Sequence, residues 1–279
     1  MTTRELLRHA TVALRGAGCD APRLDAELLL MFVWGLARTD LIVRALDEVP
    51  EDICEAFEEK LERRKKREPV AYILGEKEFW SRRFEVSADV LIPRPETEHM
   101  IEAVLESFPD QKGSYRFCDI GTGSGCIAIT LACEYPNAHV TATDISERAL
   151  KLAKANAVRL GVESRMSFRK GDMLNALKQE DGPYDAVVSN PPYVALHEME
   201  LLEAELGHEP KHALTDGRDG LSFLSTILDA APKRLQRNGC IIVETGLCGL
   251  PETPGILQLD KTIYDLAGLL RGARYRFVS

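Results

Sequence analysis

The feature that most constrains the fold is an alternation of strand-like and helix-like segments that begins at Tyr115. Strands are expected at YRFCDI, HVTATD, RMSFRKGD, YDAVVSN and GCIIVET, and helices at SGCIAITLACEY, SERALKLAKANAVRLG and LSFLSTILDAAPKRL. The segments VTAT and AVVS lack polar alternation, which is typical of strands buried on both faces. The alternation therefore predicts a mostly parallel sheet with helices on both faces, in a domain of the α/β class.

The residues before this alternation are predicted to form a small helical domain over 1–70. Apolar residues recur near helical spacing in three segments, which predicts helices over about 6–14, 23–36 and 51–66. The region contains 12 Lys and Arg against 14 Asp and Glu, so it is not basic overall. We interpret its basic run, RRKKR at 63–67, as a solvated last helical turn whose cations complement the helix dipole. A contact with RNA or with an acidic partner is the alternative.

A linker and a larger domain are expected after the helical region. Residues 71–92 are predicted to hold a β-hairpin, because EFWSRRFEV places aromatic and β-branched residues around a polar turn. Pro93 and Pro95 then hold the chain extended ahead of a helix. The larger domain is expected to occupy 93–279.

Bulk properties disfavour several classes of protein. The formal net charge of the 279 residues is -9, which argues against a partner bound mainly through phosphates. The longest apolar run, 28–37, is too short to cross a bilayer, and the N-terminus lacks a signal-peptide pattern. The seven cysteines include no CxxC pair, and Pro210 interrupts the one pair of histidines at helical metal-site spacing. We therefore expect a cytoplasmic protein with reduced thiols, no metal and no membrane partner.

The segment FCDIGTGSG predicts a cofactor loop between the first strand of the alternation and the helix that follows. Gly121, Gly123 and Gly125 let the backbone turn tightly and approach a ligand, and the helix N-terminus behind them offers unpaired N–H groups. The spacing is G-x-G-x-G rather than the G-x-G-x-x-G of a dinucleotide site. Asp119 before the loop disfavours a pyrophosphate and suits the cationic amino group of S-adenosylmethionine. A ligand-free turn and an NAD-type cofactor are the alternatives.

Acidic residues follow the next two strands. Asp144 lies 19 residues after Gly125, at the spacing where an acid accepts hydrogen bonds from ribose hydroxyls. Asp172 is a candidate acceptor for an adenine amino group, and Met173 is a candidate cover for the adenine ring. These two residues could equally belong to a loop and the core.

The fourth strand leads into Asn190, Pro191, Pro192 and Tyr193. Two successive prolines fix the backbone, so the Asn190 side chain and the Pro191 carbonyl become two fixed acceptors. Two acceptors suit an NH2 group on a conjugated nitrogen, and holding both N–H bonds directs the nitrogen lone pair at an electrophilic methyl group. Tyr193 would offer a flat face to the planar group. The corner therefore predicts methylation of an amide or of an exocyclic amine.

DIGTGSG, TATD, GDM and SNPPY, with LIPRPETE upstream and HEPKHALTDGRDGL downstream, resemble the HemK/PrmC methyltransferases over roughly residues 1–246. The resemblance implies a Rossmann-like class I methyltransferase domain. It also implies methyl transfer from S-adenosylmethionine, with S-adenosylhomocysteine as product, to the glutamine amide in the GGQ motif of peptide chain release factors. The helical N-terminal domain would help to dock the release factor.

The same resemblance implies the roles of individual residues. The cofactor would contact the loop Gly121, Thr122, Gly123, Ser124 and Gly125, together with Asp144, Met173 and Asn190. Thr97, in the RPETE segment, would lie near the methionine end of the cofactor. Asn190, Pro191, Pro192 and Tyr193 would cradle the glutamine. We expect a monomer that binds no nucleic acid directly.

One region departs from the family pattern. Pro251, Pro254 and Gly255 stand where a helix is usual, and the segment 247–264 is several residues short, so we expect altered outer strands. The rival activities are glutamine methylation on a ribosomal protein, adenine-N6 methylation of DNA and guanine-N2 methylation of ribosomal RNA. A binding module without activity is a further alternative. The nucleic-acid enzymes should carry a basic face for phosphates, which the residue counts do not indicate.

Overall fold

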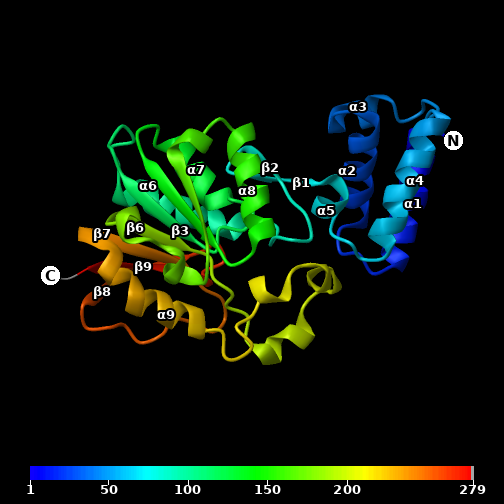
Figure 1. Cartoon of the computed structure of the whole chain (residues 1–279). Helices are drawn as coiled ribbons and strands as arrows, with labels where there is room; N and C mark the ends of the chain where they lie inside the picture. Colours follow the sequence, from blue (N-terminus) through cyan, green and yellow to red (C-terminus); the bar gives the residue numbers. More distant parts are fainter. Residues whose placement is uncertain (278–279) are drawn as a thin grey trace. The chain divides into compact units, whose positions relative to one another are not determined.

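The computed structural model describes residues 1–277, with the side chain of residue 180 excepted. The chain divides into two compact units (Figure 1). One unit contains Met1–Glu76 together with the short segment Glu203–His208, and the other contains Lys77–Leu202 with the residues from Glu209 onward. No helix within residues 1–277 is long and apolar enough to cross a membrane.

The larger unit is built on a sheet of seven strands, in the order β5-β4-β3-β6-β7-β9-β8. The strands are β3 Arg116–Ile120, β4 His139–Asp144, β5 Met166–Lys170, β6 Tyr184–Ser189, β7 Leu235–Glu244, β8 Leu257–Tyr264 and β9 Leu270–Phe277. The strands β5, β4, β3, β6 and β7 pair in parallel with one another, and β9 is antiparallel to both β7 and β8. The mostly parallel sheet predicted from the sequence is thus confirmed. The strand order reverses between β3 and β6, which is where open α/β sheets bind ligands.

Helices cover both faces of this sheet. They are α6 Glu98–Ser107, α7 Cys126–Glu134, α8 Glu147–Arg159 and α9 Ser222–Ala230. Residues of α6, α7 and α8 form one core with Phe117, Val188 and Ile242, whereas α9 forms a second core with Cys118, Val187 and Ile241. Neighbouring residues of each strand enter opposite cores because side chains alternate along a strand. Figure 1 shows α6, α7 and α8 on the side of the sheet opposite α9.

The remaining elements of this unit are short. The predicted hairpin forms as β1 Glu76–Phe79, whose first residue belongs to the smaller unit, and β2 Arg82–Glu85. The 3-10 helices are η1 Pro95–Thr97, η2 Glu163–Arg165, η3 Met173–Ala176, η4 Gln179–Asp181, η5 Leu196–Leu201, η7 Lys211–Ala213 and η8 Ala231–Arg234. No helix forms between β7 and β8. The outer strands β8 and β9 pair over most of their length, with register shifts between Leu259 and Lys261 and between Ile263 and Tyr264. The expectation that the outer strands differ from the family pattern stays a prediction.

The smaller unit contains the helices α1 Thr3–Gly16, α2 Pro22–Trp34, α3 Arg38–Val43, α4 Glu51–Lys65 and α5 Val70–Leu74, and η6 Ala204–His208. Its core includes Leu14, Leu29, Leu30 and Phe57, which are fully buried. The three predicted helices are present. The helices α3 and α5 were not predicted, because six and five residues are too few to show a helical period.

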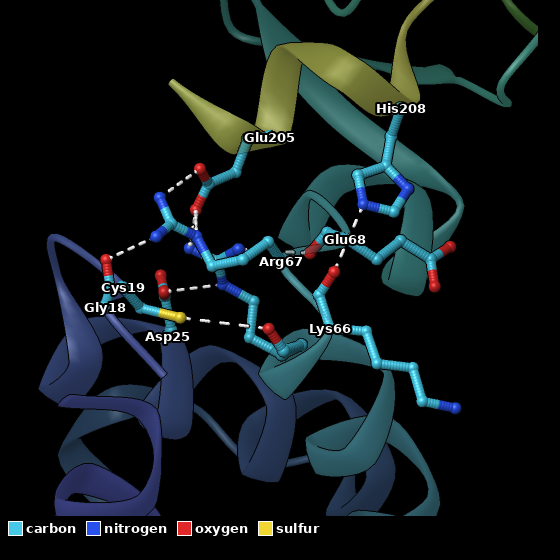
Figure 2. Close-up of polar contacts among 9 residues, drawn as sticks. Gly18, Cys19, Asp25, Lys66, Arg67, Glu68, Glu205 and His208 are labelled. Carbon is cyan, nitrogen blue, oxygen red and sulfur yellow. Dashed lines mark hydrogen bonds and ion pairs between the residues drawn. The ribbon is translucent and has the colours of Figure 1, made fainter. Parts of the chain in front are cut away.

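The basic run at 63–67 is not simply a solvated helix end. Arg64 is 5% exposed and binds Asp25 at 2.8 Å and Glu205 at 2.7 Å. Arg67 also binds Glu205, and His208 lies 3.2 Å from the Lys66 carbonyl oxygen (Figure 2). Two arginines of the run thus attach the segment Glu203–His208 to the helical unit. The sequence interpretation is wrong for these two residues because their partner is distant in the chain.

Candidate functional site

A cavity of about 370 Å³ lies at the carboxyl ends of the parallel strands, where the strand order reverses. Its walls include residues 89–94, Thr97, 120–124, Asp144, Ile145, Asp172, Met173, 189–192, His212, Ala213, Phe223 and Ile227. Most of the residues predicted to bind the cofactor therefore line one cavity. Asp119, Gly125 and Tyr193 do not line it.

The glycine loop has the backbone that the sequence predicted. Gly121, Gly123 and Gly125 all have positive φ angles, which side chains with a Cβ rarely adopt. A Cβ added at Gly121 or Gly123 would meet nothing within 4 Å, so their open side faces free space. A Cβ at Gly125 would lie 2.7 Å from Ile129 Cδ1. The first two glycines thus leave room for a ligand, and Gly125 allows close packing at the start of α7.

Asp119 forms hydrogen bonds that hold this loop in place. It is fully buried, and its Oδ2 accepts hydrogen bonds from the Thr122 hydroxyl at 2.6 Å and from the Ala128 N–H at 3.3 Å. Burial raises the pKa of its carboxyl to about 7, although these two donors oppose the shift. Its Oδ1 is buried with no hydrogen-bond partner within residues 1–277. A direct contact with the cofactor's amino group, expected from the sequence, has no support in this placement.

Asp144 ends β4 in the cavity wall, next to the glycine loop. Its Oδ2 accepts a hydrogen bond from Gly123 N at 2.9 Å, and its Oδ1 accepts one from Ser146 N at 2.8 Å. Each carboxylate oxygen has further acceptor capacity, so ribose hydroxyls remain suitable partners. Asp172 is exposed and Met173 is partly buried, and both line the same cavity. Their roles toward an adenine ring stay predictions.

The segment around Pro93 and Arg94 forms another wall. The Ile92 N–H donates to Glu209 Oε2 at 3.0 Å, and Arg94 Nη2 binds Glu209 Oε1 at 2.5 Å. Glu209 is 5% exposed and precedes His212 and Ala213, which also line the cavity. Sequence reasoning did not single out Glu209. It stands in the quoted segment HEPKHALTDGRDGL, but no local pattern indicated its partner 115 residues away.

The corner after β6 is held from two sides. The Ser189 hydroxyl donates to the Ile120 carbonyl at 2.8 Å, which ties the corner to the neighbouring strand β3. Asn190 Nδ2 donates to Thr97 Oγ1 at 3.0 Å. With its nitrogen side engaged, the Asn190 amide has its oxygen available to accept hydrogen bonds from a substrate. Pro191 and Pro192 lie beside it in the cavity wall.

Tyr193 is anchored away from the cavity wall. Its hydroxyl donates to Glu244 Oε1 at 2.9 Å, and a Cβ added at Gly246 would lie 2.8 Å from its ring. Burial and the nearby Glu244 carboxyl raise the pKa of the Tyr193 phenol, so the hydroxyl stays protonated. Sequence reasoning missed Glu244, although an acid at the end of an apolar strand, in CIIVETG, was a visible sign. The contact of the Tyr193 ring with a substrate stays a prediction.

Comparisons with known proteins agree with this architecture. A family model described as the PrmC N-terminal domain matches residues 5–75, and one described as the methyltransferase small domain matches residues 99–245. A release factor glutamine methyltransferase from Neisseria gonorrhoeae is 41% identical over 255 residues, which cover 90% of this chain and 92% of that protein. A protein of the same name from Nitratidesulfovibrio vulgaris is 41% identical and covers 97% of this chain and 93% of its own length. The chain belongs to the release factor glutamine methyltransferase family.

Membership of this family makes the chain a methyltransferase that uses S-adenosylmethionine as its cofactor. The match to the methyltransferase small domain spans the glycine loop, Asp144 and the Asn190 corner. The catalytic domain of human Mettl16, solved with an RNA hairpin, is 17% identical. It covers 70% of this chain and 74% of its own with a TM-score of 0.51, and supports the fold alone.

Proposed function

We propose that this chain transfers a methyl group from S-adenosylmethionine to the side-chain amide nitrogen of the glutamine in the GGQ motif of peptide chain release factors. The observation that carries the proposal is the Asn190 corner, whose amide oxygen is left available beside the cofactor cavity. The family relatives named release factor glutamine methyltransferases support the substrate class.

The cavity residues fit this cofactor. Gly121 and Gly123 leave open space at the loop, and the Asp144 carboxylate is placed where ribose hydroxyls can donate to it. The acidic side chains Asp89, Asp144 and Asp172 in the cavity wall suit a ligand that carries positive charge. When bound, the cofactor supplies an electrophilic methyl group on a sulfonium.

The protein's part in the reaction is to orient the acceptor nitrogen. The Asn190 oxygen and the Pro191 carbonyl each accept a hydrogen bond from one N–H of the glutamine amide. These two hydrogen bonds turn the nitrogen lone pair out of conjugation and toward the methyl group. The two prolines hold these acceptors in a fixed direction. A strong general base is unnecessary, because the nitrogen becomes very acidic once it carries the methyl group.

The finer assignments follow from the same proposal. The unit that contains Met1–Glu76 helps to dock the release factor, and the protein works as a monomer in the cytoplasm without binding nucleic acid or membrane. The excess of acidic residues, with a formal net charge of -9, supports a protein partner over a nucleic acid.

One assay tests the proposal. The protein is incubated with methyl-labelled S-adenosylmethionine and a release factor whose GGQ glutamine is intact or replaced by alanine, and separately with DNA and ribosomal RNA. We expect label on the intact release factor only. Label that persists on the alanine variant, or that appears only on nucleic acid, would contradict the proposed substrate.

A further inference from the structure

The Ser124 carbonyl of the glycine loop is bound by a side chain that lies 32 residues further along the chain. Asn156, on α8, donates from Nδ2 to this carbonyl at 2.9 Å. Asn156 is fully buried, and Ser124 is 2% exposed. Ser124 also lines the cavity, so this hydrogen bond connects the buried side of α8 to the wall of the candidate site.

The Ser124 carbonyl needs a donor from outside its own segment. It precedes α7, which begins at Cys126, and the Ala128 N–H in the first turn of that helix donates to Asp119 rather than to this carbonyl. A buried carbonyl without a partner destabilises the fold. The Asn156 amide supplies the missing donor, and it thereby fixes the direction in which the Ser124 peptide group points.

The same amide holds the hairpin β1–β2 against α8 (Figure 1). Its Oδ1 accepts from the Glu85 N–H at 2.8 Å, and its Nδ2 also donates to the Glu85 carbonyl at 3.0 Å. Both side-chain N–H bonds of Asn156 are thus used, one by β2 and one by the glycine loop. Arg159, on the same helix, donates to the Arg83 carbonyl and to Asn156 Oδ1, which gives α8 a second contact with the hairpin.

We propose that Asn156 is a positioning residue for the cofactor, which holds the glycine loop in its binding conformation by fixing the Ser124 carbonyl to α8. An amide suits this role because a single NH2 group can donate to two carbonyls at once. The consequence for ligand binding rests on the proposed function, which places S-adenosylmethionine in this cavity. The hydrogen bonds of Asn156 are a property of the protein alone.

Loss of the amide should reduce the affinity for the cofactor. Without the Asn156 donor, the free loop can turn the Ser124 carbonyl toward water, and binding then has to return it to a buried position with no partner. We therefore expect the Kd for S-adenosylhomocysteine to rise by about 10-fold or more in Asn156→Ala. At saturating cofactor, kcat should stay within about twofold of the native value, because the Asn190 corner is unchanged.

Two further variants separate the loop contact from the packing of α8. Asn156→Asp keeps the volume of the side chain and an acceptor for the Glu85 N–H but lacks the NH2 group, so its Kd should rise as in Asn156→Ala. It carries the test if the alanine variant does not fold. Arg159→Ala is the matched control, because it removes a contact between α8 and the hairpin and leaves the hydrogen bond from Asn156 to Ser124 in place. We expect it to bind S-adenosylhomocysteine with the native Kd.

A measurement on the native protein requires no variant. The Asn156 NH2 group is bonded to the cavity wall, so its NMR signals should shift when S-adenosylhomocysteine binds. The signals of the Asn137 NH2 group, which donates to the Lys112 carbonyl on the exposed surface, should not shift. Asn156 signals that stay unchanged at saturation would overturn the inference.

Hydrogen exchange of the ligand-free proteins reports on the loop without any cofactor. We expect faster exchange of residues 121–125 in both Asn156 variants, and faster exchange of residues 82–85 in these variants and in Arg159→Ala. Loop exchange and Kd values that stay native in a folded Asn156 variant, or that change equally in Arg159→Ala, would contradict the role of Asn156. A native protein that binds no S-adenosylhomocysteine, but whose loop exchange responds to the Asn156 substitutions as expected, would instead contradict the proposed function alone.

Discussion

Two carboxyl groups near the cavity have raised pKa values because they are fully buried. Burial raises the pKa of Asp119 and of Glu244 to about 7 in each case. Asp119 accepts from Thr122 and Ala128 under the glycine loop, and Glu244 accepts from Tyr193 behind the corner. Asp119 thus supports the loop that lines the cavity, and Glu244 anchors Tyr193, which follows the cavity-lining Pro192 in the chain.

The raised pKa of Asp119 predicts a pH dependence of stability. In the unfolded chain an aspartate ionises near pH 4, so between roughly pH 4 and 7 the folded protein holds a proton that the unfolded chain has lost. The contribution is fully present below the unfolded pKa and is lost as the pH rises through 7. Between pH 5 and pH 8 we expect the free energy of unfolding to fall by about 2 kcal/mol from this group. Denaturant unfolding at several pH values measures it.

The control for this prediction is Asp229, an exposed carboxyl on α9. The variant Asp119→Asn should show a shallower decline in stability between pH 5 and pH 8, whereas Asp229→Asn should follow the native protein. An unchanged slope in Asp119→Asn would show that the buried carboxyl does not titrate in this range.

At the scale of elements, η6 is bound to the helical unit by ion pairs, because it is far in sequence from the other residues of that unit. Burial alone would raise the pKa of Glu205, but hydrogen bonds from Arg67 and Arg64 lower it to about 2. Arg64 is itself buried and is shared with Asp25. The attachment of this segment is therefore electrostatic and local to the ends of α4 and η6.

Removing the charge of Glu205 should release the segment. Its lowered pKa gives stability that is present above the unfolded value near 4.3 and is lost as the pH falls toward 2. In Glu205→Gln we expect hydrogen exchange of residues 203–208 to increase, corresponding to a loss of about 2 kcal/mol, at neutral pH. Glu203→Gln changes an exposed glutamate in the same segment and should leave the exchange unchanged. Equal protection in both variants would contradict the ion-pair attachment.

The loop after β7 permits a steric test of the corner. Gly246 does not have a positive φ, so alanine is compatible with its backbone, but the added Cβ would press on the Tyr193 ring at 2.8 Å. We expect Gly246→Ala to lower kcat by about 10-fold by displacing Tyr193, with cofactor binding preserved. Gly255→Ala, where a Cβ meets nothing within 4 Å, is the matched control. Normal turnover in Gly246→Ala would show that the position of Tyr193 is unimportant.

Local patterns predicted the elements and the cavity-lining residues better than the contacts between distant segments. The strand His139–Asp144 appears with the predicted bounds, and the glycine loop and Asn190 line one cavity. The partners of Asn190, Tyr193 and Arg64 lie 93, 51 and 141 residues away in the chain. Nothing in the local pattern specifies such pairs, so the roles of Glu244 and Glu205 as partners were identified only from the folded structure.

For the molecule as a whole, the order of the strands explains why the site lies where it does. The reversal between β3 and β6 opens a crevice at their carboxyl ends. The loop after β3 places the glycines there, the end of β4 places Asp144, and the loop after β6 places Asn190. The segment Glu203–His208 belongs to the helical unit although it lies between two parts of the larger one. The chain thus passes from the Asn190 corner to the helical unit and back before it reaches α9.

The central claim is that the Asn190 corner directs a methyl group to a glutamine amide. The most direct measurement is peptide mass spectrometry of a release factor after reaction, comparing the native protein with Asn190→Ala and measuring cofactor binding in both. We predict one added methyl group on the side-chain nitrogen of the GGQ glutamine with the native protein. With Asn190→Ala we predict a rate at least about 100-fold lower while the cofactor still binds. Methylation at another residue, or near-normal transfer by Asn190→Ala, would contradict the account.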